Sequence, residues 1–300
     1  MWGWEAPVIA IGVAIVVFLQ WRESNFARRI ATGDFEGSSL GQVVPVLWNE
    51  YGAGRVRPDF LARLPTAGKL GPNAVQQVVC LDIAAGRYVE ALRWQTQPRR
   101  HVAENERLLL LNLAEARACL GQLDEALSMT EFAEKVQTDF LRAGLASHRA
   151  WVLSELGRPA EAREQLERTK RQRGLLGPFE AEWHFSAFAV AFAERNWVVA
   201  EAALDDAERV AVRGTTKRNL HFLRGRLAFA RGELERALGH FEEGGRHVYR
   251  CQGGPALLDW GRALQQLGRI DEARTIWERC RAEDPQSPAA LEAARLLTGS

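Results

Sequence analysis

The sequence predicts an all-α protein, an α-solenoid of about six helical hairpins preceded by one transmembrane helix. Three observations lead to this fold class. A short phrase recurs along the chain with a nearly constant period, a glycine stands at the same place in most copies, and the opening stretch is almost wholly apolar. A period of this length is typical of stacked arrays built from one helical unit.

The recurring phrase is clearest in "LGQLDEAL", "RGELERAL" and "LGRIDEAR", which end at Leu127, Leu238 and Arg274. One alanine of each copy serves as a marker, and successive markers lie 35, 36, 38, 37 and 36 residues apart. The six markers are Ala91, Ala126, Ala162, Ala200, Ala237 and Ala273. Because one such unit cannot bury its apolar face alone, the repetition predicts a continuous stack.

Each copy of the phrase has the chemistry of a helical hairpin. Its glycine ends the first helix, because glycine adopts the left-handed backbone of a helix terminus without steric cost. These glycines are Gly86, Gly121, Gly157, Gly232 and Gly268, and Arg195 stands at the corresponding place in the fourth copy. Acidic residues then open several of the second helices, where the helix dipole favours negative charge. The marker alanine is expected where the two helices cross closely.

The phrase and its period resemble tetratricopeptide repeats. That family's pattern places small residues in the first helix, glycine at the turn, and small and aromatic residues in the second helix. The matching residues of the last copy are Trp260, Gly261, Gly268, Ile270, Ala273, Trp277, Cys280 and Pro285. The resemblance covers about residues 72–286. Arg195 at the fourth turn, Pro159 in the third copy and an early end of the second helix before Pro98 depart from the pattern.

Four segments follow from these observations. Residues 1–21 are predicted to form a transmembrane anchor. Residues 22–71 form a juxtamembrane segment that is either a degenerate hairpin or an irregular cap. Residues 72–286 form the repeat array, and residues 287–300 form a C-terminal capping helix and tail, since arrays need a polar outer face at their ends.

The anchor prediction depends on twenty residues between Trp2 and Trp21, which as a helix would span about 30 Å, the thickness of a bilayer core. A cleaved signal peptide is the alternative, but no basic residue precedes the apolar run and no small-residue cleavage site follows it. A buried helix is a third possibility. Arg22, Arg28 and Arg29 follow the run, so the positive-inside bias predicts a single-pass protein of a bacterial inner membrane with a cytoplasmic repeat domain.

Composition argues against several functions. The net charge of +1 lacks the basic excess of a nucleic-acid binder. The motifs of common nucleotide-binding and hydrolytic enzymes are missing from the sequence, so we predict no enzyme, no cofactor and no metal site. The strongest metal alternative is a cluster of His240, Glu242, Glu243 and His247. The four cysteines are widely spaced without a CxxC pair, as expected of buried thiols.

The remaining function is binding of protein or peptide partners. In tetratricopeptide arrays the first helix of each hairpin lines the concave face, and the resemblance implies a groove lined by Glu115, Trp151, Phe185, Phe192, Phe222, Arg226, Phe229 and Arg262. Some of these aromatic residues could equally belong to the core. We therefore predict a membrane-tethered scaffold. A periplasmic scaffold or chaperone and a non-catalytic regulatory subunit of a membrane enzyme are the alternatives, and the sequence does not define the oligomeric state.

Overall fold

The computed structural model describes residues 25, 29–30, 42–44, 46–47, 72–84, 86–95, 104–134, 139–170, 180–210, 214–245 and 253–299. The predicted anchor at residues 1–21 and most of residues 22–71 lie outside this set. Within it, every regular element is a helix, and none of these helices is both long and apolar enough to cross a membrane. Ile30, Val43, Val44 and Leu47 are described and are wholly buried.

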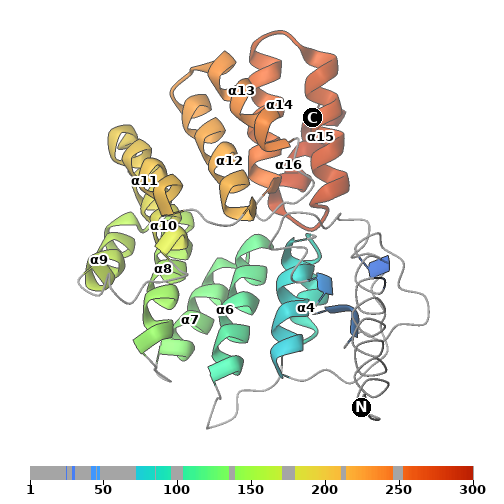
Figure 1. Cartoon of the computed structure of the whole chain (residues 1–300). Helices are drawn as coiled ribbons and strands as arrows, with labels where there is room; N and C mark the ends of the chain where they lie inside the picture. The colour runs from blue at the N-terminus through green and yellow to red at the C-terminus, as the bar shows by residue number, and fades with distance from the viewer. Residues whose placement is uncertain are drawn as a thin grey trace, which may run out of the picture.

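Six helical hairpins follow one another between residues 72 and 283 of the described chain, and a single helix covers the last of them (Figure 1). The hairpins are α4 (Pro72–Ala84) with α5 (Tyr88–Leu92), α6 (Glu104–Cys119) with α7 (Leu123–Glu134), α8 (Asp139–Glu155) with α9 (Pro159–Lys170), α10 (Glu180–Ala193) with α11 (Trp197–Val210), α12 (Gly214–Ala230) with α13 (Leu234–Gly245), and α14 (Gly253–Gln266) with α15 (Ile270–Glu283); the last helix is α16 (Pro288–Thr298). The predicted all-α hairpin array is therefore confirmed, and α5 is short, as expected.

All six turns share one hydrogen-bond pattern. The amide of the turn residue donates to the carbonyl three residues earlier, and the next amide donates to the carbonyl five residues earlier. In the fifth hairpin, for example, the Gly232 nitrogen lies 2.9 Å from the Phe229 oxygen, and the Glu233 nitrogen lies 2.9 Å from the Ala228 oxygen. This is the Schellman motif, which satisfies the last carbonyls of the first helix and requires a left-handed turn residue.

Arg195 adopts the same left-handed conformation as the glycines, with φ of 57° compared with 70–78° at the five turn glycines. Its amide and that of Asn196 make the two Schellman hydrogen bonds to Phe192 and Ala191. Arginine in place of glycine at the fourth turn therefore leaves the geometry of the turn unchanged. It adds backbone strain, since a residue with a side chain in this region of φ costs about 1–2 kcal/mol.

Replacing Arg195 with glycine should therefore stabilise the protein. Part of the relieved strain is offset by the greater freedom of glycine in the unfolded chain, so the expected gain in the free energy of unfolding is about 0.5–1 kcal/mol. Urea denaturation of Arg195→Gly and the wild type measures it. An unchanged or lower midpoint would show that the Arg195 side chain contributes more than its backbone strain costs.

The marker alanines lie where the paired helices cross. All six are wholly buried, as predicted: Ala91, Ala126, Ala162, Ala200, Ala237 and Ala273 each have 0% exposure. Glycines on the first helices create room for large side chains of the second helices. A Cβ atom at Gly225 would lie 2.5 Å from the Phe241 ring, and one at Gly261 would lie 2.1 Å from Nε1 of Trp277. The hairpins are thus held by knob-and-hole contacts that leave no space for a methyl group.

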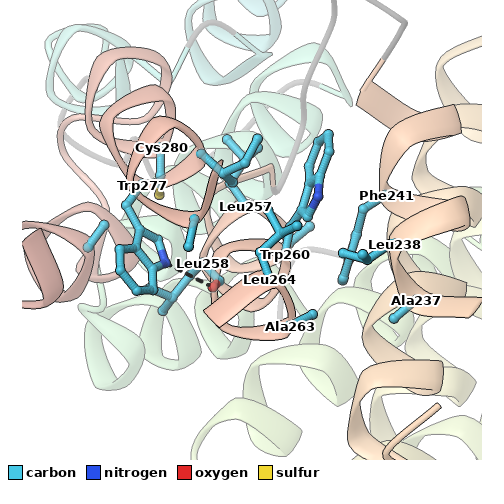
Figure 2. Packing of buried hydrophobic residues seen from close by; sticks show 14 of the residues in the cluster. Ala237, Leu238, Phe241, Leu257, Leu258, Trp260, Ala263, Leu264, Trp277 and Cys280 are labelled. Carbon is cyan, nitrogen blue, oxygen red and sulfur yellow. Dashed lines mark hydrogen bonds between the residues drawn. The ribbon is translucent and has the colours of Figure 1, made fainter. Parts of the chain in front are cut away.

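The largest apolar cluster joins the last two hairpins to α16. Figure 2 shows Phe241 of α13 beside Trp260 of α14, with their ring centroids 6.1 Å apart. Trp277 of α15 donates its Nε1 proton to the Leu258 carbonyl across 3.4 Å. Ala289 and Ala293 of α16 complete this cluster. The C-terminal helix therefore covers the apolar face of the last hairpin.

The start of α16 has the features of a stable helix terminus. Ser287 has an extended backbone, and its hydroxyl accepts a hydrogen bond from the Ala290 amide at 3.2 Å. Pro288 follows at the first helical position, where a missing amide proton costs nothing. The segment that ends the array thus folds back as a defined cap.

Candidate partner-binding surface

Residues six positions before each turn residue form a row across the first helices. The row consists of Cys80, Glu115, Trp151, Ala189, Arg226 and Arg262, and every one of them is half-buried. Four of the eight predicted groove residues occupy this row. Since the row repeats once per hairpin, neighbouring members come from neighbouring first helices.

A second row lies nine positions before each turn residue. It contains Gln77, Asn112, His148, Ser186, Leu223 and Asp259. We call the two rows together the first-helix face. Two hydrogen bonds join the first row of one hairpin to the second row of the next. Asn112 donates to the Cys80 sulfur at 3.0 Å, and Nε of Arg226 donates to Oδ2 of Asp259 at 3.1 Å. Adjacent first helices therefore pack with an offset of about one turn.

Charged and aromatic side chains form a chain of contacts across α10, α12, α14 and α16. The Arg226 guanidinium lies over the Phe192 ring, 5.4 Å from its centroid. Arg226 also pairs with Asp259, which lies 3.8 Å from Arg262, and Arg262 pairs with Glu292 at 3.2 Å. Arg226 and Arg262 are thus held in place by carboxylates of the neighbouring helices. Sequence reasoning found the two arginines but missed both carboxylates, although Asp259 stands one helical turn before Arg262.

The four predicted phenylalanines do not share one environment. Phe185 and Phe192 are half-buried on α10, and Phe229 is half-buried on α12. Phe222 is only 3% exposed, and Gly244 of α13 approaches its ring so closely that a Cβ atom there would lie 3.0 Å away. Phe222 is therefore part of the core between α12 and α13, and we remove it from the candidate surface. Phe185 stands at the same position before its own turn residue but is half-buried, so the packing of α12 against α13 and not the register alone buries Phe222.

Trp151 lies at the middle of the first row. Its ring meets the His148 ring in an edge contact with 5.3 Å between the centroids. Burial lowers the pKa of His148 to about 4, so this imidazole is neutral at physiological pH. The pair therefore offers an aromatic surface without a positive charge.

Glu115 is the unusual acid of the first-helix face. Burial and the nearby Glu182 carboxylate raise the pKa of Glu115 to about 7. Near neutral pH this carboxyl is thus a mixture of its protonated and ionised forms. A cation that approached it would favour the ionised form.

The pKa of Glu115 predicts a specific pH dependence of stability. The pKa of Glu115 in the folded protein lies above its ordinary value of 4.5, so the folded state holds this proton more tightly than the unfolded state does. The resulting contribution to the free energy of unfolding is complete below pH 4.5 and is lost as the pH rises through about 7. Glu115→Gln should remove this loss. Between pH 5 and pH 8 the wild type should lose about 1–3 kcal/mol more in the free energy of unfolding than the variant.

Urea denaturation at the two pH values measures the difference. Glu235→Gln is the matched control, since Glu235 is an exposed glutamate in the first turn of α13. The control should keep the pH dependence of the wild type. If the free energy of unfolding changed equally with pH in the Glu115 and Glu235 variants, the raised pKa of Glu115 would be contradicted.

The proposed metal alternative gains no support from the described residues, among which no group of three metal-ligating side chains is found. His247 lies outside the described set. His240 instead faces His221, with 6.1 Å between the ring centroids. Burial and the nearby His221 lower the pKa of His240. Of the described cysteines, Cys80 and Cys119 are half-buried and Cys280 is buried, with burial raising the pKa of Cys280 to about 12.

Comparison with known proteins agrees with this architecture. Tetratricopeptide-repeat patterns match residues 108–131, 143–168 and 219–243, and a second pattern of the same description matches residues 255–295. These segments fall on the second, third, fifth and sixth hairpins. The fourth hairpin, which contains Arg195, and the first, which contains the short α5, are not among the matched segments.

A solved structure shares the fold. It is that of a tetratricopeptide repeat protein from Parabacteroides merdae ATCC 43184, with a TM-score of 0.52, 13% identity, and coverage of 92% of this chain and 96% of the other. No curated protein matches the chain in sequence. Four segments of the chain therefore match tetratricopeptide-repeat patterns, and the chain shares the fold of a solved tetratricopeptide repeat protein.

Proposed function

We propose that this protein is a membrane-tethered scaffold that binds protein or peptide partners along its first-helix face. The observation that carries the proposal is the half-buried row of Glu115, Trp151, Arg226 and Arg262 at one register of the first helices. A partner that lies across successive hairpins would meet one member of this row in each. Apolar anchors would then supply affinity and the charges would supply orientation.

The chemistry of the row changes along the array. Glu115 of α6 and Glu182 of α10 give one end of the array an acidic character. Trp151 lies on α8, between these two helices. Arg226 and Arg262 give the α12–α14 end guanidinium groups, although Asp259 and Glu292 neutralise them. The candidate aromatic side chains of the first helices are Trp151, Phe185, Phe192 and Phe229. Burying them at about 1.5–3 kcal/mol each, less an association cost of about 4 kcal/mol or more, corresponds to affinities no tighter than about micromolar. The proposed partner is thus exchangeable.

Substituting the central anchor should weaken partner capture. We expect Trp151→Ala to reduce the partners recovered with affinity-tagged full-length protein by about tenfold or more, as loss of a central tryptophan does at interfaces. Val198→Ala is the control, because Val198 is 76% exposed on a second helix. Quantitative mass spectrometry of proteins purified from the native membrane fraction provides the measurement.

Circular dichroism and thermal unfolding would show that the variants are folded, and Arg262→Ala gives a second variant because its side chain is 37% exposed. Capture that is equal in the wild type and in the Trp151 and Arg262 variants would remove the first-helix face as the binding surface.

The tether is supported by the sequence of residues 1–21 and by the arginines that follow. Deleting residues 1–21 should move the protein from the membrane pellet to the supernatant at high salt. A cysteine engineered at exposed Glu125 should be labelled by a membrane-impermeant maleimide only after cell lysis, with cysteine-free background at the native positions. Labelling in intact cells would favour the periplasmic scaffold, and unchanged fractionation after the deletion would contradict the tether.

A further inference from the structure

The first and last hairpins of the array contact each other. Gln286, in the turn between α15 and α16, accepts a hydrogen bond from the Val89 amide at 2.9 Å through its Oε1 atom. Its Nε2 group donates to the Glu90 carboxylate at 3.1 Å. One side chain from the end of the array thus holds the start of α5, almost two hundred residues earlier in the sequence.

A buried carboxylate supports the same contact. Burial raises the pKa of Asp284, and its interactions with the Tyr88 side chain, the Ser287 side chain and the Gly254 amide oppose this rise. The Ser287 hydroxyl donates to the Asp284 backbone carbonyl at 3.0 Å, and Oδ1 of Asp284 is buried without a hydrogen-bond partner among the described residues. Tyr88 is 2% exposed and Asp284 is 6% exposed, so water has little access to the pair. The interaction between Tyr88 and Asp284 therefore links the first hairpin to the last, while Gly254 and Ser287 hold Asp284 within the last hairpin and the cap.

The turn glycines also distinguish the two ends from the middle of the array. A Cβ atom at Gly86 would lie 2.8 Å from the Glu283 carbonyl oxygen, and one at Gly121 would lie 3.0 Å from Cγ of Pro288. A Cβ atom at Gly157, Gly232 or Gly268 would have nothing within 4 Å. Only the first two glycine turns are pressed against the C-terminal end of the array.

This contact differs from ordinary stacking. In a solenoid each unit contacts its neighbours, and distant units stay apart. Here the loop-proximal ends of α4 and α5 meet the α15–α16 turn (Figure 1). The described hairpins therefore form a closed path.

The contact between the first and last hairpins is one joint of this path, and the packing of α11 against α12 is the other. Leu204 of α11 and Leu220 of α12 belong to one apolar cluster, and ion pairs surround it. Arg224 pairs with Asp205 and Glu208 at 2.8 Å each. Glu201 pairs with Arg231 at 2.8 Å and with Arg236 at 3.1 Å. Partly exposed ion pairs of this kind contribute little individually and are screened by salt.

We propose that the contact of Gly86, Tyr88, Val89 and Glu90 with residues 283–288 is a latch that closes the array, and that the α11–α12 joint is the hinge on which it opens. Opening would break the hydrogen bonds of Gln286 with Val89 and Glu90 and the contact of Tyr88 with Asp284, while the hairpin cores on either side would stay intact. The α12–α16 half would then rotate relative to the α4–α11 half. The latch does not depend on the proposed function, although opening would change the spacing between the two ends of the first-helix face.

The chain offers a matched pair of substitutions for testing the latch. Gly86 and Gly157 both have φ of 70°, so alanine imposes the same backbone strain at either turn. Only the Gly86 methyl group would collide with the other end of the array. Gly86→Ala should open the latch and Gly157→Ala should leave it closed. Gln286→Ala, which removes two hydrogen bonds without any backbone strain, provides an independent variant.

The exchange rate of the Val89 amide proton reports on the latch directly. Val89 is the second residue of α5, where helix amides have no partner within the helix, so its protection comes from Gln286. In full-length protein we expect exchange at least tenfold faster in Gly86→Ala and Gln286→Ala than in the wild type, with Gly157→Ala unchanged. Equal exchange in the Gly86 and Gly157 variants would overturn the latch.

Small-angle X-ray scattering tests the hinge. The radius of gyration should increase in Gly86→Ala, and should increase further in 1 M NaCl, because the hinge ion pairs are screened. Gly157→Ala should match the wild type at both salt concentrations. Faster Val89 exchange with an unchanged radius of gyration would show that the contact opens only locally, and this result would reject the hinge.

Discussion

The close crossing of two helices over a buried alanine is the constraint on which the remaining structure depends. The crossing requires a small residue on the second helix and a left-handed turn residue that reverses the chain within about two residues. Both are present in all six hairpins, and Arg195 shows that the chain accepts backbone strain to keep the turn. Once every hairpin has the same crossing, its first helix meets the neighbouring first helix at a fixed offset.

That offset determines which side chains come together on the first-helix face. A residue six positions before one turn lies near a residue nine positions before the next turn, as Cys80 does with Asn112 and Arg226 does with Asp259. At ten positions before the turn, Phe222 enters the hairpin core, whereas Phe185 at the same position of its own hairpin is half-buried. One residue of register turns a side chain by about 100° around a helix, and the packing of the neighbouring helices then decides whether that side chain is core or candidate surface.

Closure of the path adds a constraint that no single hairpin contains. Each hairpin is stabilised by its own crossing and by its neighbours, so the two halves keep their cores whether or not the ends meet. In the proposed latch, the contacts between Tyr88 and Asp284 and between Val89 and Gln286 set the orientation of the two halves. In the proposed opening, the distance between the two ends of the array would change while the first-helix face of each hairpin keeps its local geometry.

The sequence by itself determined the all-α class, the six hairpins and the turn positions, because the repeating alanine and glycine encode local geometry that recurs with every copy. The family resemblance also implied a groove of eight residues, of which Glu115, Trp151, Arg226 and Arg262 stand at one register of the first helices. Only the tertiary structure decided that Phe222 is core, that Asp259 and Glu292 hold the arginines, and that the two ends of the array touch. These contacts depend on the accumulated rotation from hairpin to hairpin, a quantity that side-chain packing sets and that no single repeat contains.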